Sequence, residues 1–421
     1  MSDNIKLHLD IKEFELPNGM KVIMSKRSEL PIMSMNMTFY VGSKDEEENK
    51  TGIAHLLEHL MFEGSPNTGK GEFDEILNNN GGDSNAYTSW DMTGYYLVLP
   101  STKLELGLWL DSDRLTGFGI SEESFKVQQS VVLEEKLQTQ DNVPYGSLEE
   151  ESSGRLFKTS GYRWPVIGFK DNIENLKLSD AEDFFNRFYK PNNAVLSIVG
   201  DIDYSETEKL VTKYYGGIER GEKIPRKKFT DGYLIKENSS TIISDVQLPG
   251  KFMFYLIPKI GSREYYEMQI LNKIFTAGES SKLYNEMVYN SQMANEAESM
   301  IYGMEHISIF FVNLIARKGV KVEELEMKFD DILERIKNGN ISDEEIQKAK
   351  NKLETGYFAK FSSSVFLSEK LSEYKTLFGN YESLINEINM YESINRNNII
   401  NISNKYLNKN QRVNLSYLPK E

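Results

Sequence analysis

Two of the four histidines in the chain stand four positions apart with a glutamate between them, in the run His55-Leu-Leu-Glu58-His59. If this run is helical, positions 55, 58 and 59 share one face. Two imidazoles one turn apart can then converge on one ion, with a carboxylate beside them. A zinc ion held by two histidines and one carboxylate keeps a fourth position open for water. The spacing therefore predicts a hydrolytic zinc site.

The chemistry of such a site follows from its ligands. Zinc lowers the pKa of its bound water to about 7 and stabilises the oxyanion that forms when water attacks a carbonyl. A carboxylate between the histidines can take the water proton and pass it to the leaving amine, and we assign that role to Glu58. The alternative is a helix that serves only the core, because its other positions are apolar: Ile53, Leu56, Leu57 and Leu60.

A third ligand must come from elsewhere in the chain. The sequence has no cysteine, so thiolate ligands and disulfides are excluded, and only His, Asp and Glu remain as donors. A predicted helix that begins after Ser121 carries two adjacent carboxylates, Glu134 and Glu135, behind an apolar run at residues 131–133. Helical periodicity does not choose between the two, and most such pairs on helices are solvated.

The elements that must position these residues are helices and strands in mixed order, which indicates the α+β class. Apolar residues recur at three and four between residues 52 and 62, which predicts a helix. Strands are expected at residues 14–16, 20–24, 33–41, 86–88, 93–99 and 194–199, and further helices at 71–79, 103–115, 121–138 and 205–215. The charged run at residues 44–50 is predicted to be a solvated connector.

The second half of the chain repeats features of the first. Ser28-Glu-Leu-Pro31 and Val246-Gln-Leu-Pro249 each precede an expected strand, and the motifs at residues 120–123 and 341–344 each open a helix, at offsets of 218 and 221 residues. Residues 219–232 are polar and basic and contain Pro and Gly, which is typical of a linker. We therefore predict a zinc-bearing domain in residues 1–218 and a second domain in residues 233–421.

Charge and hydropathy exclude several classes of partner. The 421 residues carry a formal net charge of −15, with 64 acidic against 49 basic residues, which argues against nucleic acid and anionic membranes as partners. Residues 1–12 lack the apolar core of a signal peptide, and no apolar run approaches the length of a membrane span. The predicted location is the cytoplasm.

Further short motifs follow one another along nearly all of the first half. They are Leu16-Pro-Asn-Gly19, Val41-Gly-Ser43, residues 51–62 (TGIAHLLEHLMF), Asn80-Gly-Gly82, Asn85-Ala-Tyr-Thr88, residues 131–135 (VVLEE), Pro165-Val-Ile-Gly168 and Pro191-Asn-Asn-Ala194. In these motifs and their order the sequence resembles the pitrilysin and mitochondrial-processing-peptidase family, whose members are inverzincin zinc peptidases.

The resemblance implies a ligand set and a fold. His55 and His59 would bind one zinc ion per chain, Glu58 would be the general base, and the third ligand would be Glu135, 76 positions beyond His59. It also implies two related α/β-roll domains, each an antiparallel-rich sheet packed against helices. That expectation agrees with the internal repeat.

The resemblance further implies how a peptide would bind. Asn85, Ala86 and Tyr87 would lie on an edge strand that pairs with the extended backbone of the substrate, a mode called β-augmentation. The alternative for these three residues is an ordinary buried strand. Family members often carry a glutamate seven positions before the third ligand, where this chain has Gln128. A neutral amide can still hydrogen-bond a ligand or substrate, so this difference concerns tuning of the site.

The second half departs further from the family pattern. Family members commonly supply an arginine and a tyrosine from the second domain, and the matching positions here are Val288 and Asn295, with Tyr289 or Tyr302 as nearby substitutes. Short members of the family pair as dimers that enclose a chamber. We therefore predict a heterodimer in which a related subunit supplies the missing arginine and tyrosine, with a homodimer as the alternative.

These features together predict a zinc-dependent endopeptidase acting on short or unfolded peptides. One alternative is a non-catalytic assembly subunit of the same fold, and another is a binding module that holds zinc without turnover. A non-catalytic subunit has no physical need to keep two histidines and two glutamates together, so the intact set favours the enzyme.

Overall fold

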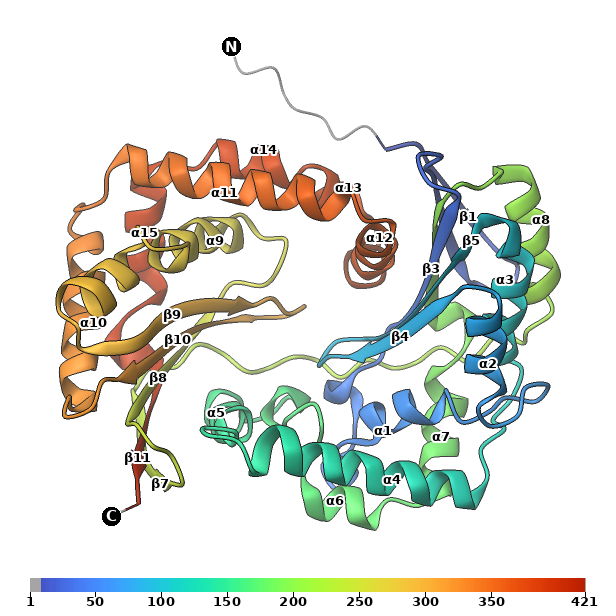
Figure 1. Ribbon diagram of the computed structural model, residues 1–421, viewed down its shortest axis with the longest axis horizontal. Helices are drawn as coiled ribbons and strands as arrows, with labels where there is room; N and C mark the ends of the chain where they lie inside the picture. The colour runs from blue at the N-terminus through green and yellow to red at the C-terminus, as the bar shows by residue number, and fades with distance from the viewer. Residues whose placement is uncertain (1–8, 421) are drawn as a thin grey trace.

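The computed structural model describes residues 9–420 (Figure 1). The prediction that residues 1–12 do not form a signal peptide rests mainly on residues 1–8, which lie outside the described residues. The first half contains β1 Ile11–Glu15, β2 Lys21–Lys26, β3 Ile32–Phe39, α1 Ile53–Leu60, α2 Glu72–Asn79, β4 Asp83–Thr88, β5 Thr93–Pro100, α3 Leu104–Asp113, α4 Glu122–Lys136, α5 Leu148–Leu156, α6 Lys170–Asn175, α7 Leu178–Phe188, β6 Ala194–Gly200 and α8 Tyr204–Tyr215.

The second half contains β7 Asn238–Ser244, β8 Gly250–Ile257, α9 Arg263–Thr276, β9 Ala294–Tyr302, β10 Ser308–Ala316, α10 Val322–Lys337, α11 Asp343–Phe361, α12 Ser364–Phe378, α13 Glu382–Ile385, α14 Glu387–Glu392, α15 Arg396–Tyr406 and β11 Arg412–Pro419. Within residues 9–420, no helix is both long enough and apolar enough to cross a bilayer.

The two sheets have the same topology. The first has the strand order β1-β2-β6-β3-β5-β4 and the second β7-β11-β8-β10-β9, so the sheets correspond strand for strand once β1 is set aside. In both, the first pair is parallel (β2 with β6, β7 with β11) and the other pairs are antiparallel. The predicted pair of related α/β-roll domains is confirmed.

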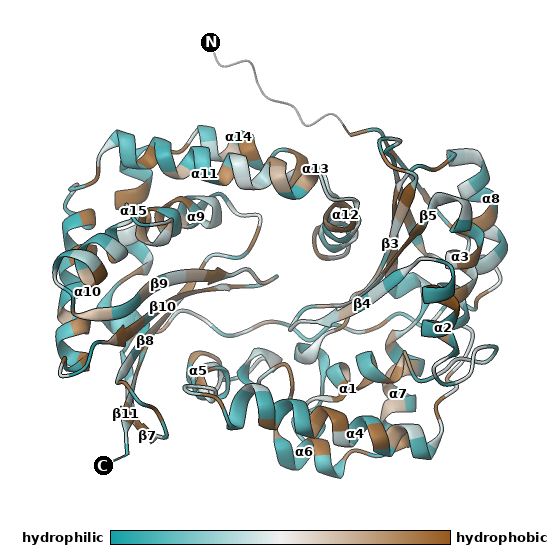
Figure 2. Ribbon diagram, viewed as in Figure 1, coloured by the Kyte–Doolittle hydropathy of each residue, from teal (hydrophilic) through white to brown (hydrophobic). Residues whose placement is uncertain are grey.

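The motifs that suggested a repeat lie at equivalent places. Residues 28–31 lead into β3 and residues 246–249 into β8, while α4 and α11 begin directly after residues 120–121 and 341–342. Central strands such as β6 and β8 are buried along their whole length, because both faces of each sheet are covered. Figure 2 shows hydrophobic colour concentrated on the strands, whereas outer helices such as α4 and α11 alternate in colour.

One helix from each half packs against the sheet of the other half. Helix α12 lies over β3 and β6 of the first sheet (Figure 1). Its buried Ser368 and Ser372 form hydrogen bonds of 2.9 and 2.6 Å with Ser34 and Asn36 of β3, and Thr38 donates to Ser372 at 2.9 Å. In the other direction, α5 packs against β8 and β11 of the second sheet. The two halves are therefore interlocked.

Residues 219–234, which contain the predicted linker, form neither helix nor strand. They are nevertheless held along their length. Arg226 donates to the Tyr40 carbonyl and to Asn193 Oδ1, both at 2.6 Å, and the carboxylate of Asp231 accepts backbone N–H groups of residues 158–160 at 2.8–3.0 Å. The segment thus follows the surface of the first half before it enters β7.

Candidate metal centre

Helix α1, which carries the histidine pair, begins at a tightly packed turn. Gly52 precedes it with φ +89°, and a Cβ on Gly168 would stand 2.5 Å from the Gly52 Cα, so both positions need glycine for this close backbone approach. The buried carboxylate of Glu46 accepts N–H groups of Gly52 at 3.1 Å and Ala54 at 2.9 Å. Glu46 therefore caps the N-terminus of α1, although it lies outside the helix.

The three predicted ligands converge. His55, His59 and Glu135 each offer a donor atom within 4.8 Å of the other two. The His55 Nε2 lies 3.8 Å and the His59 Nε2 3.3 Å from the two carboxylate oxygens of Glu135. Ligand atoms around a tetrahedral zinc with bonds of about 2.0 Å stand about 3.3 Å apart, so the set fits one ion with a small inward adjustment.

Helix α4 brings Glu135 to this position. The Ser121 side chain caps α4 by accepting the Ser124 N–H at 3.0 Å, as the sequence predicted. The buried Phe125 and Val132 then fix the helix on the core that also holds α1. The neighbouring Glu134 turns away and accepts a hydrogen bond of 2.7 Å from Gln138. The helix thus separates the two carboxylates that periodicity alone left equivalent.

Protonation of the group agrees with metal binding. Burial and the neighbouring His59 lower the pKa of His55 to about 4, so this imidazole is neutral at pH 7. The contact with His59 lowers the pKa of Glu135, although burial opposes it. Burial alone would lower the pKa of His59, but Glu135 and Glu58 outweigh it and raise that pKa. Metal ligands must be deprotonated, so zinc binding would compete with protonation of His59.

Glu58 lies on the same helix but outside the three-residue group. Thr88 of β4 donates a hydrogen bond of 2.5 Å from its hydroxyl to Glu58 Oε2. Burial raises the pKa of Glu58, and the Thr88 bond offsets part of the rise. A carboxylate with a raised pKa is better able to take up a proton near neutral pH. Glu58 is therefore placed between the candidate metal group and strand β4.

Strand β4 is at the edge of the first sheet and, within residues 9–420, pairs only with β5. Its side chains alternate: Ala86 packs on the first core, whereas Asn85 is exposed on the opposite face. Tyr87 shares the face of Asn85 and lies across Gly94, where a Cβ would stand 2.3 Å from the Tyr87 ring. Burial raises the pKa of Tyr87, and the carboxylates of Glu369 and Glu373 on α12 raise it further.

Gln128 lies two turns before Glu135 on the same face of α4. Its amide donates to Glu63 Oε1 at 2.7 Å, and it is close enough to His59 to help raise the pKa of that imidazole. The side chain therefore bridges the end of α1 and the candidate ligand group. A neutral amide at this position can hydrogen-bond a ligand.

The two positions at which the family pattern has an arginine and a tyrosine lie on or beside β9. Val288 packs against the second core, and Asn295 is exposed on β9. Tyr289 and Tyr302, the two possible substitutes, are 69% and 44% exposed. Neither tyrosine is fixed by a hydrogen bond of its hydroxyl within the described part of the chain, so both rings remain available to a ligand or a partner.

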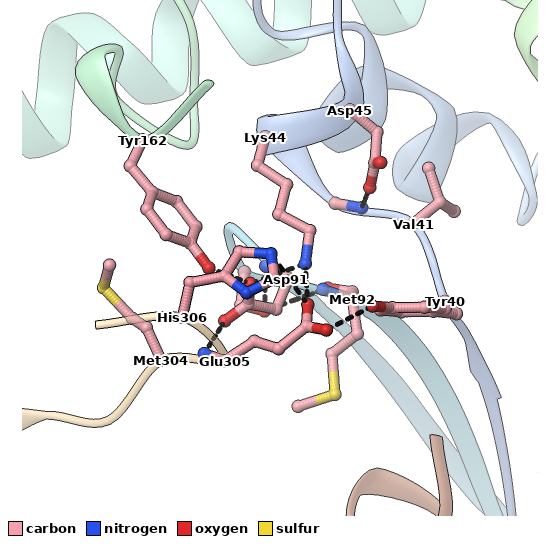
Figure 3. Close-up of polar contacts among 12 residues, drawn as sticks. Tyr40, Val41, Lys44, Asp45, Asp91, Met92, Tyr162, Met304, Glu305 and His306 are labelled. Atoms are coloured by element: carbon pink, nitrogen blue, oxygen red, sulfur yellow. Dashed lines mark hydrogen bonds and ion pairs between the residues drawn. The ribbon is translucent and has the colours of Figure 1, made fainter. Parts of the chain in front are cut away.

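A buried polar cluster joins the two halves next to β4 (Figure 3). It links the turn at residues 89–92, after β4, with the equivalent turn at residues 303–307, after β9. Lys44 donates to Asp91 at 2.7 Å and also to Glu305, and the Glu305 N–H donates to Asp91 at 2.9 Å. Tyr40 donates to Glu305, and Tyr162 donates to Asp91 at 2.5 Å. The cluster ties the candidate substrate strand to the second half.

The cluster corrects one sequence prediction. Residues 44–50 were expected to be solvated, but the Lys44 side chain is only 10% exposed and Glu46 only 1%. Lys44 is buried because carboxylates of both halves meet it, and Glu46 because it caps α1. The burial of Glu46 could have been predicted locally, since an acidic residue six positions before Gly52 can reach the start of the predicted helix. The pairing of Lys44 with Glu305 has no such local signal.

Comparison with known proteins gives the same assignment. The chain matches the sequence model of Insulinase (Peptidase family M16) over residues 21–159 and that of the Peptidase M16 inactive domain over residues 175–353. Together these matches span most of the chain, which belongs to peptidase family M16. The resemblance inferred from the motifs is confirmed.

Individual relatives agree with this family. The chain is 26% identical over 408 residues to Zinc protease PqqE of Helicobacter pylori, covering 96% of this chain and 92% of that protein. It is 25% identical over 398 residues to an uncharacterized zinc protease of Rickettsia felis, covering 93% of each.

Solved structures share the fold. The crystal structure of a protease from Helicobacter pylori has a TM-score of 0.94 at 26% identity and covers 98% of this chain and 100% of that one. The periplasmic protease PqqL from Escherichia coli has a TM-score of 0.79 at 18% identity and covers 98% of this chain but 48% of that one.

Proposed function

We propose that this chain is a zinc-dependent endopeptidase that hydrolyses peptide bonds in short or unfolded peptides. The observation that carries the proposal is the convergence of His55, His59 and Glu135 beside Glu58, which itself contacts an edge strand with an unpaired side. Similarity to proteins named zinc proteases supports the same reaction.

The residues of this chain would divide the work as follows. His55, His59 and Glu135 would hold one zinc ion, which when bound supplies a Lewis acid and an activated water. The substrate backbone would pair with the free side of β4 through residues 85–87, which requires an extended peptide. Glu58 would take a proton from the attacking water and return it to the leaving amine, so the same carboxylate serves as base and then as acid.

Matched substitutions test these roles. Glu58→Gln should keep zinc and lower kcat by about 100- to 10,000-fold, since it removes only proton transfer. Glu135→Gln should lower zinc content, whereas Glu134→Gln, one position away, should leave both zinc content and kcat at the wild-type level. The measurements are zinc per chain by elemental analysis and cleavage of a mixed peptide library. Zinc loss in Glu134→Gln but not in Glu135→Gln would refute the ligand set.

The same variants separate the alternatives. A non-catalytic assembly subunit would cleave no peptide even with zinc bound. A zinc-dependent binding module would bind peptide equally well with and without Glu58→Gln and would never turn it over. Zinc-dependent cleavage by wild type that is lost in Glu58→Gln contradicts both.

We further propose that the active form is a heterodimer with a related subunit that supplies an arginine and a tyrosine, with a homodimer as the alternative. Val288 and Asn295 cannot make the contacts of those two side chains, which supports the need for a partner. Activity should therefore rise when the related subunit is co-purified, as judged by light scattering and kcat/KM. Equal activity of the pure single chain would rule the heterodimer out.

Two further assignments complete the proposal. We propose the cytoplasm as the location, which cell fractionation would test. We also propose the division into residues 1–218, 219–232 and 233–421. Limited proteolysis should then cut first within 219–232, and a first cut inside either flanking unit would count against this division.

A further inference from the structure

The second half contains a cavity of about 490 Å³ that the proposed reaction does not use. It lies between α9, α11, α12 and α14, and its lining includes four tyrosines and four lysines beside apolar side chains. Four lysines from three helices reach it: Lys273 of α9, Lys352 and Lys360 of α11, and Lys370 of α12. In a chain with a net charge of −15, such a gathering of cations is a local exception.

Most of these cations have no anionic partner. Lys370 pairs with Glu369 at 3.4 Å and with Glu373, which also lines the cavity. By contrast, Lys273, Lys352 and Lys360 form no ion pair with any carboxylate in residues 9–420. Burial, together with repulsion from Lys360 and Lys352, lowers the pKa of Lys273. Lys352 and Lys360 are exposed and Lys273 is half-buried, so an anion in the cavity could approach all three ammonium groups and offset their mutual repulsion.

The second acidic residue of the lining, Glu387, is already engaged. Glu387 accepts a hydrogen bond of 2.5 Å from the Tyr391 hydroxyl. Burial raises the pKa of Glu387, although Tyr391, Lys370 and Lys360 oppose the rise. The lining thus retains an excess of positive charge beside aromatic walls, and the aromatic rings suit an organic anion with apolar neighbours.

The cavity adjoins the candidate substrate strand through a single helix. Lys370 and Glu373 line the cavity from α12, and the same two residues act on the hydroxyl of Tyr87 on β4. Helix α12 is the element that the second half places on the first sheet. Helix α12 also contacts β5, the strand that pairs with β4, so the cavity and the sheet of the candidate substrate strand share this helix. The anion that a peptide can deliver is a carboxylate.

We propose that this lysine and tyrosine cavity binds a carboxylate of the peptide substrate. The carboxylate comes either from the peptide's C-terminus or from an Asp or Glu side chain. The inference rests on the proposed peptidase function for the identity of its ligand, but binding can be measured without turnover.

The test uses full-length Glu58→Gln protein loaded with zinc, so that bound peptide is not cleaved. Three fluorescent peptides of otherwise identical sequence are compared by anisotropy: one with a free C-terminus, one amidated with an internal Glu, and one amidated with Gln. The Glu58→Gln protein with an unchanged cavity should bind at least one of the two carboxylate peptides about tenfold more tightly than the neutral peptide. This corresponds to a difference of about 1.4 kcal/mol in binding free energy. Whichever carboxylate peptide is preferred identifies the source.

The paired substitution Lys273→Gln with Lys360→Gln should abolish that preference and leave the affinity for the neutral peptide unchanged. Lys209→Gln, which changes an exposed lysine on α8, is the matched control and should keep the preference. Far-UV circular dichroism checks that both variants are folded. Equal binding of all three peptides, or a preference that survives the paired substitution, overturns the proposal.

Cleavage by the wild-type enzyme separates the two hypotheses. If peptides with and without a carboxylate are cleaved equally well, the peptidase function stands and the carboxylate site fails. If the carboxylate peptides bind more tightly but none of a wider library is cleaved, the carboxylate site stands and the peptidase function fails.

Discussion

Lys44→Met removes the one cation at the centre of the cluster that joins the two halves, while keeping a side chain of similar length. The side chains of Lys44, Asp91 and Glu305 are 10%, 6% and 12% exposed, so the carboxylates left behind stay out of water. Breaking a buried ion pair by removing one partner costs about 3–5 kcal/mol. We expect a loss of that size in the free energy of unfolding.

The control is an exposed ion pair in the first half. Lys213 pairs with Glu105 at 2.7 Å, and the two side chains are 59% and 54% exposed. Water screens such an exposed pair, so Lys213→Met should unfold like wild type. Each methionine variant deletes one lysine, but Lys44 has two buried carboxylate partners and Lys213 has one exposed partner. The difference between the variants therefore reports both the burial and the number of the partners.

Urea unfolding provides the assay, with two probes. All three tryptophans (Trp90, Trp109 and Trp164) lie in the first half, so fluorescence follows that half while far-UV circular dichroism follows the whole chain. In wild type the two transitions should coincide, and in Lys44→Met the fluorescence midpoint should fall and separate from the other.

A rescue tests the physical reason. Adding Asp91→Asn and Glu305→Gln removes the uncompensated charges, so the triple variant should recover part of the lost stability. If Lys44→Met unfolds at the same urea concentration as Lys213→Met, the cluster does not stabilise the interface and the reasoning is refuted.

Three further predictions concern the helix cap, the metal and acid stability. Glu46→Ala should lower both the thermal midpoint and the zinc affinity. The substitution leaves the backbone N–H groups at the buried start of α1 without their acceptor, at a cost of about 1–3 kcal/mol. A zinc affinity equal to that of wild type would contradict this prediction. Chelation should abolish cleavage, zinc should restore it, and free zinc at about 1,000 times its Kd should add about 4 kcal/mol of stability. Burial would raise the pKa of Glu326, but Lys251 and Arg412 outweigh it and lower that pKa to about 2 from 4.5. The stabilisation from ionised Glu326 is therefore complete above pH 4.5 and is lost as the pH falls towards 2. Glu326→Gln should lower the free energy of unfolding at pH 7 but not at pH 2. Equal effects at both pH values would contradict this prediction.

Local features of the structure could be predicted from the sequence because their causes are local. The helix expected at residues 52–62 is α1 at Ile53–Leu60, since its apolar spacing is set by the core it covers. The strand expected at residues 93–99 is β5 at Thr93–Pro100. The choice of Glu135 over Glu134 needed the family resemblance, because both lie on one helix and only tertiary packing decides which one meets the imidazoles.

Features that depend on distant partners could not be predicted in this way. Lys44 meets Glu305 across 261 positions, and nothing near either residue indicates the other. Ser368 and Ser372 have the polarity of surface residues, yet they are buried because β3 offers matching polar groups. The lysines of the cavity lie on three separate helices, so their grouping emerges only when α9, α11 and α12 pack together.

The reciprocal packing of α5 and α12 has a consequence for how the chain tolerates breakage. A single cut in residues 219–232 would yield two fragments, each of which keeps a helix that covers the other's sheet. The fragments should therefore migrate as one particle under native conditions and part only in denaturant. For the same reason, each half produced alone would expose the face of its sheet that the helix of the other half covers. The two halves would therefore have to be produced together to remain in solution.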